Sequence, residues 1–146
     1  MPKITARDEV KMLSIYDADD ILNDFGARTR ILVKLSGVLT ARRKENAEMI
    51  ATIVESSGED DRRLHYWQGK ADRIDELETT LSSVLTAKAD KKRGLIDFIG
   101  KVAMTTLVYI PEEWDSNRAD YASGAYHISN TIIGEFQAAL TAELDA

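Results

Sequence analysis

Two pairs of acidic residues have the type and spacing that a metal site would need. Glu45 and Glu48 are three positions apart, and Asp72 and Asp75 repeat that spacing further along the chain. Residues three apart share one face of a helix, so two antiparallel helices would let four carboxylates converge. Carboxylate oxygens suit Mg²⁺ beside a phosphate group. Acids at this spacing also occur on ordinary solvent-exposed helices, and 25 of the 146 residues are Asp or Glu.

The order of these four acids is similar to the ExxE…ExxD motif of the all-α nucleotide pyrophosphohydrolases, the group of MazG and the dimeric dUTPases. That resemblance implies a Mg²⁺-dependent enzyme in which Glu45, Glu48, Asp72 and Asp75 hold the metal while water attacks a nucleotide phosphate. Asp72 stands where the motif has Glu. We treat this enzyme as the alternative to the non-enzymatic function given below.

The two histidines are the other candidates for chemistry. His65 is followed by Gly69 and Lys70, whereas a phosphoacceptor histidine is usually followed, after two residues, by Lys and then Gly. His127 has no acid at metal-binding spacing beside it. We therefore expect His65 to be a partly buried or surface side chain near a helix start, and His127 to serve helix packing. Two isolated histidines without cysteine predict no zinc site and no cofactor.

Composition excludes several other classes of function. The net charge of −6 disfavours broad binding to a nucleic-acid backbone, which depends on Lys and Arg. The chain has no cysteine, which excludes disulfides and thiol catalysis. No apolar run is long enough to cross a membrane, and the first residues lack the apolar segment of a signal peptide. We expect a cytoplasmic protein or a component of a virion.

Hydrophobic periodicity predicts an all-α fold in which residues 1–146 form one helical domain. The chain has 44% hydrophobic residues, enough for a core, and its only prolines are Pro2 and Pro111. The interior is therefore free to be helical. We expect a helical bundle of about four main helices with a short leading N-terminal helix.

The start of the chain carries two helix start signals about a dozen residues apart. Thr5 with Asp8 has the shape of a capping box, and an Asp-rich turn at 17–20 favours the start of a second helix. An isolated helix this short is marginal in water. Residues 1–16 therefore make sense as a lid on the bundle or as an arm that reaches a neighbouring subunit.

One long helix is predicted from Ile21 to the loop at 56–60. Gly37 is where we expect a break, because a glycine weakens a helix by about 1 kcal/mol relative to alanine. A strand over residues 31–35 is the alternative. Steps of three, four and seven residues define the apolar face of this helix, which consists of Ile21, Leu22, Phe25, Leu32, Leu35, Leu39, Met49, Ile50, Ile53 and Val54.

The next predicted helix carries Trp67, Ile74 and Leu81 at intervals of seven residues, a seam suited to another helix. We expect the cationic run at 88–94 to form its C-terminal end, where the helix dipole favours positive charge.

A further helix is predicted to begin at Gly94, with a short strand near 105–110 as the alternative for its β-branched end. Pro111 then marks the entry to a last helix. The apolar stripe of that helix consists of Tyr121, Ala125, Ile128, Ile132, Phe136, Ala139 or Leu140, and Leu144.

The opening segment ITARDEVKMLSIYDADDIL (4–22) resembles the start of the tailed-phage head–tail connector (adaptor) family. The shared order is Ile-Thr, two acids, Lys11, Leu13, Ile15 and an acidic turn. IPEEW (110–114), before a long amphipathic helix, is similar to the Pro-led C-terminal helix of that family. The middle of this chain is longer and more helical than the corresponding segment of the family.

The resemblance implies a structural protein whose small helical subunits assemble into a ring beneath the portal and continue the DNA channel. Apolar residues on more than one helix face independently favour self-association. We expect a homo-oligomer, with portal or tail proteins as further partners and no specific binding to nucleic acid or membrane. The interface candidates are Leu13, Ile15, Tyr16, Trp114 and Tyr121. A small acidic regulatory protein that sequesters another protein is a third alternative.

Overall fold

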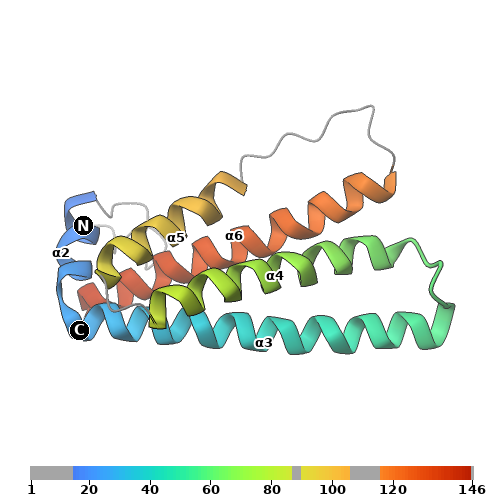
Figure 1. Ribbon diagram of the computed structural model, residues 1–146, viewed down its shortest axis with the longest axis horizontal. Helices are drawn as coiled ribbons and strands as arrows, with labels where there is room; N and C mark the ends of the chain where they lie inside the picture. Colours follow the sequence, from blue (N-terminus) through green and yellow to red (C-terminus); the bar gives the residue numbers. More distant parts are fainter. Residues whose placement is uncertain (1–14, 87–89, 106–115, 146) are drawn as a thin grey trace, which may run out of the picture.

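The computed structural model describes residues 15–86, 90–105 and 116–145. These residues form five helices: α2 (Ile15–Asn23), α3 (Phe25–Ser57), α4 (Arg63–Thr86), α5 (Lys91–Thr105) and α6 (Ser116–Asp145). The four longer helices make a bundle, and α2 lies across one end of it (Figure 1). The predicted all-α bundle is thus confirmed. None of the described helices is both long and apolar enough to cross a membrane.

The helical conformation is interrupted at Asp24, between α2 and α3. The Asp24 side chain accepts a hydrogen bond from the backbone N–H of Ala27 at 2.8 Å and so caps the start of α3. The predicted break at Gly37 is wrong, because α3 runs through that residue without interruption. Gly37 is exposed and nothing approaches it, while Leu35 and Leu39 on either side are fully buried. Packing of the flanking leucines therefore holds the helix together.

Two other expectations for this region have different outcomes. The alternative of a strand over 31–35 is wrong, since these residues belong to α3. The Asp-rich turn at 17–20 falls inside α2, close to its start, so the second start signal belongs to α2 rather than to the long helix. The expected first helix near Thr5 lies outside the described residues, as do residues 106–110 of the suggested strand.

The described cations of the run at 88–94, which are Lys91, Lys92 and Arg93, belong to a different helix from the one predicted. α4 ends at Thr86, and Lys91 already begins α5. The carboxylate of Asp90 accepts hydrogen bonds from the backbone N–H groups of Lys92 and Arg93, at 2.9 and 3.3 Å. An aspartate cap at a helix start therefore outweighs the preference of cations for a helix C-terminus. The ammonium group of Lys92 also pairs with Asp19 of α2 at 2.6 Å.

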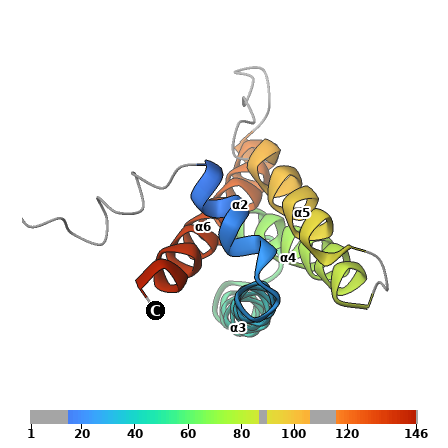
Figure 2. The same cartoon turned by 90° about the vertical axis from the view of Figure 1, so that its left-hand side faces the viewer.

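Side-chain contacts fix the directions of the helices. α3 runs antiparallel to α6, because Arg30 near the start of α3 meets Glu143 near the end of α6. α4 runs parallel to α6, since Arg62 pairs with Asp120 and Arg73 bonds to Ser129 further along both helices. α4 and α6 pack against each other, and α3 and α5 each contact both of them; seen end-on, α3 lies below this pair and α5 lies above it (Figure 2).

One hydrophobic core joins all five helices. It contains four residues of the apolar stripe predicted for the long helix (Leu22, Leu32, Leu35 and Leu39) and the middle of the stripe predicted for the last helix, from Ile128 to Leu140. Several predicted members are instead exposed, among them Phe25, Met49 and Leu144. The core residues are Leu22, Ile31, Leu32, Leu35, Leu39, Ile74, Leu77, Leu81, Val84, Leu95, Phe98, Val102, Ile128, Ile132, Phe136, Ala139 and Leu140.

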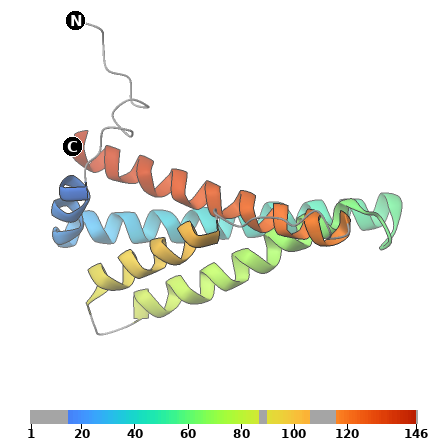
Figure 3. The same ribbon diagram turned by 90° about the horizontal axis from the view of Figure 1, so that it is seen from above.

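Two glycines bring the backbones of α4 and α6 into direct contact. A Cβ atom built on Gly69 would lie 2.0 Å from the carbonyl oxygen of Tyr121, and one built on Gly124 would lie 2.0 Å from that of Tyr66. Only glycine therefore allows this approach. Seen from above, α4 and α6 converge towards the end of the bundle away from α2 and diverge towards α2, where α5 lies between them (Figure 3). We call the converging end the distal end.

Candidate functional site

The four acids that resemble a pyrophosphohydrolase motif do not gather at one point. Glu45 and Glu48 are exposed on α3. On α4, Asp72 accepts a hydrogen bond from the hydroxyl of Tyr121 at 2.5 Å, and Asp75 pairs with Arg43. Within the described ranges no group of three or more acidic, histidine or cysteine side chains is arranged to hold a metal ion. The two helices are antiparallel, which is the arrangement that convergence of the four acids would require, but their buried contact is formed by apolar side chains such as Leu39 of α3 and Ile74 of α4.

The interface candidates are only partly described. Leu13 and Trp114 lie outside the described residues, and Ile15 and Tyr16 begin α2. The Tyr121 side chain is 40% exposed on α6, and its hydroxyl is bonded to Asp72 of α4. Tyr121 therefore links two helices of its own chain, and its role in subunit contacts stays a prediction.

The hydrogen bond from Tyr121 to Asp72 raises the pKa of the Tyr121 phenol from 10.0 to about 12. Removal from solvent and the negative charge of Asp72 act in the same direction. Since the folded-state pKa exceeds the unfolded one, the stability from this bond is complete below pH 10 and is lost as the pH rises towards 12.

We expect phenolate absorbance, titrated for the intact protein and for Tyr121→Phe, to differ by one tyrosine that ionises near pH 12. In Asp72→Asn the pKa of the same tyrosine should fall towards its ordinary value. A Tyr121 that already ionises near pH 10 in the intact protein would contradict the bond.

The histidines have the structural positions predicted for them. His65 is half-buried in the first turns of α4. Nδ1 of His127 on α6 lies 2.6 Å from the hydroxyl oxygen of Tyr66 on α4, at hydrogen-bonding distance, and the two rings meet edge to face. His127 thus joins α4 to α6 next to the glycine contact.

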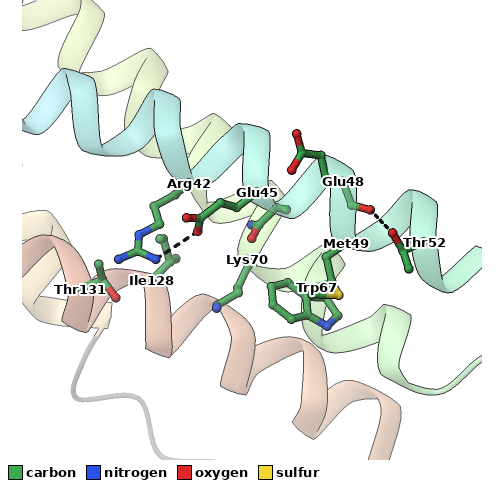
Figure 4. A pocket seen from close by; sticks show the side chains of 10 residues that line it. Arg42, Glu45, Glu48, Met49, Thr52, Trp67, Lys70, Ile128 and Thr131 are labelled. Atoms are coloured by element: carbon green, nitrogen blue, oxygen red, sulfur yellow. Dashed lines mark hydrogen bonds and ion pairs between the residues drawn. The ribbon is translucent and has the colours of Figure 1, made fainter.

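A cavity of about 470 Å³ opens between α3 and α6, and α4 lies behind it (Figure 4). We call it the α3–α6 cavity. Its volume falls within the range of pockets that hold small organic molecules. Six of its lining residues come from α3, two from α4 and two from α6: Arg42, Glu45, Asn46, Glu48, Met49, Thr52, Trp67, Lys70, Ile128 and Thr131.

The charged side chains that line the cavity differ in whether an oppositely charged group of the protein pairs with them. The guanidinium of Arg42 pairs with Glu45 at 3.1 Å. The carboxylate of Glu48 points away from Trp67 and Lys70 (Figure 4). The ammonium of Lys70 lies 4.6 Å from the ring centroid of Trp67, and no carboxylate of the described residues pairs with it. The interior of the cavity therefore presents a positive charge beside an aromatic ring.

Asn46 is the lining residue that sequence reasoning missed. Its side chain is 4% exposed, and its Nδ2 atom is buried without a hydrogen-bond partner. It lies in the segment 41–48, in which five of the eight residues are charged, a composition typical of an exposed stretch. The available signal was periodicity, because Asn46 is seven residues after Leu39 and seven before Ile53, and both of these are buried.

Comparison with known proteins gives no relative for this chain. No family model matches the sequence, and neither the characterised proteins nor the solved structures contain a significant match.

Proposed function

We propose that this protein acts by contact with other protein subunits, as a component of the head–tail connector of a tailed phage. The observation that carries the proposal is the exposure of large apolar side chains on the outside of the bundle. Phe25 and Val33 on α3 are 70% and 63% exposed, and Met104 near the end of α5 is 76% exposed. Covering such side chains with a neighbouring subunit removes apolar surface from water, which favours association.

Two further features support a connector. The sequence resemblance covers the segments 4–22 and 110–114. The exposed carboxylates Asp72 and Asp75 form bonds within their own chain, so they support a structural role better than a shared metal site.

The mass in solution tests this proposal. We expect the intact protein to sediment as a multiple of the monomer mass. Deletion of residues 1–14, which leaves α2 (Ile15–Asn23) whole, should shift the population to the monomer if the opening segment reaches a neighbouring subunit. Circular dichroism should show the same helical fold in both. A monomer in both cases, at concentrations far above those in a cell, would contradict the proposal.

A further inference from the structure

One side of α3 is not covered by the rest of the described bundle. α2, α4 and α6 pack on the other side of this helix, and seen end-on the free side carries no described helix (Figure 2). Exposed residues follow one another there in steps of four and three, the spacing with which a helix meets a second helix. Val33 among them is 63% exposed. We call this side the outer face of α3, and it consists of Val33, Gly37, Thr40, Lys44, Ala47 and Ala51.

Charge is divided along α3 in a way that a second copy of the helix would complement. Residues 25–44 contain six cations and no acid, whereas residues 45–57 contain three acids and no cation. The helix dipole favours the opposite arrangement, with acids at the start of a helix and cations at its end. The stability of α3 alone therefore does not explain the division. Two antiparallel copies of α3 would bring each positive half against a negative half.

Three charged side chains beside the outer face are available for such a contact. Glu48 and Glu55 are exposed and form no ion pair with the described residues. The ammonium of Lys34 lies 3.8 Å from the carboxylate of Glu135, too far for a hydrogen bond, and the Lys34 side chain is 46% exposed. The other paired cations are held more closely, since Arg30 meets an acid of α6 at 2.7 Å.

These charges also select how two antiparallel helices align. With residue 42 of one copy opposite residue 42 of the second copy, Val33 faces Ala51 of the second copy. At a rise of about 1.5 Å per residue, Lys34 then lies about 3 Å along the axis from Glu48 of the second copy and about 8 Å from its Glu55. A shift of one heptad in either direction moves Lys34 away from one of these acids. Only the alignment about residue 42 brings both acids close to Lys34.

We propose that the outer face of α3 binds a second copy of this chain, with the two α3 helices antiparallel about a twofold axis near residue 42. Lys34 of each copy lies beside Glu48 and Glu55 of the other. The contact deepens the proposed function and rests on its premise that copies of the chain meet. It covers Val33, whereas Phe25 and Met104 stay available to other subunit contacts. One pair of helices buries less surface than a standard protein interface, so we expect the contact to be weak on its own.

Single cysteines test the contact, because the chain contains none. In the antiparallel pair the two copies of residue 41 lie about 3 Å apart along the axis, whereas the two copies of residue 51 lie about 27 Å apart. With a short bismaleimide, full-length Ala41→Cys is expected to crosslink to a dimer at least about tenfold faster than Ala51→Cys. Ala51→Cys is the matched control, since Ala41 and Ala51 are both exposed on α3.

The crosslinking rates separate this contact from other arrangements. Equal rates at the two positions, as in a parallel pair or in random collisions, would overturn the proposal, and so would the absence of crosslinking in Ala41→Cys. The mass in solution is a separate result. An oligomer held by other contacts would still sediment as a multiple of the monomer mass while Ala41→Cys failed to crosslink, which would leave the proposed function standing.

An exchange of charges tests the pairing of Lys34 with Glu48. In the Ala41→Cys protein, Glu48→Lys should slow crosslinking at least about threefold, because two attractive pairs become repulsive. Addition of Lys34→Glu to that variant should restore the rate, which a structural effect of either substitution would not do. Asp97→Lys, exposed on α5, makes the same change of charge away from α3 and should leave the rate unchanged. A rate that Glu48→Lys does not change, or that the exchange does not restore, would overturn the pairing.

Discussion

Replacement of Gly69 or Gly124 by alanine is expected to lower the free energy of unfolding by about 3 kcal/mol, at the upper end of the usual cost of overpacking. The added methyl group would lie 2.0 Å from a backbone carbonyl oxygen of the facing helix in either case. A backbone cannot rotate away as a side chain can, so α4 and α6 must separate. Denaturant unfolding, followed by circular dichroism, measures the change.

Gly134 provides the matched control within α6. It is exposed, and a Cβ atom at this position would meet nothing within 4 Å. Gly134→Ala is expected to raise the free energy of unfolding by about 0.5–1 kcal/mol, because alanine loses less backbone entropy in a helix than glycine does. Opposite signs for Gly124→Ala and Gly134→Ala would establish the helix contact, and equal effects would contradict it.

Phe98→Ala is expected to lower the free energy of unfolding by about 4 kcal/mol, a typical cost of removing a fully buried aromatic ring. α5 is the shortest of the four bundle helices, and it is held between the diverging parts of α4 and α6 by Leu95, Phe98 and Val102. Each of these three side chains is at most 1% exposed. The lost stability should therefore appear mainly as weaker packing of α5 against α4 and α6.

Denaturant unfolding measures the change in overall stability, and amide hydrogen exchange shows whether α5 is affected more than the other helices. In Phe98→Ala the amides of α5 should exchange faster than those of α3. Asp97→Ala is the control on the same helix, since Asp97 is exposed and its truncation should change stability little. A Phe98→Ala variant as stable as Asp97→Ala would contradict the placement of α5.

The sequence predicted the helices whose burial follows a regular spacing. Leu35 and Leu39 on α3, and Ile128 and Ile132 on α6, recur at intervals that place them on one helix face, and all four are buried as expected. Such spacing reports which face of a helix meets the core. It does not depend on which other helix covers that face, so a single sequence carries the information.

The helix contact at the glycines and the placement of the acids depend on which helices face each other, and residue spacing within one helix does not identify the facing helix. Gly69 and Gly124 are more than fifty residues apart, and each alone indicates only a weak point in a helix. Whether Glu45 and Asp72 converge depends on how α3 and α4 are rotated about their axes, which two carboxylates per helix do not determine. The burial of Asn46 was not predicted, because the average composition of a charged segment does not show that one of its residues faces the core.

The parallel course of α4 and α6 has an electrostatic consequence. Peptide dipoles in two parallel helices point the same way, so both partial positive charges are found at the distal end of the bundle. The chain places an acid near each of these helix starts. Asp61 accepts a hydrogen bond from the backbone N–H of Arg63 at 2.8 Å, and Asp120 lies in the first turns of α6, bonded to Arg62. These two carboxylates offset the repulsion between like helix poles that the glycine contact brings together.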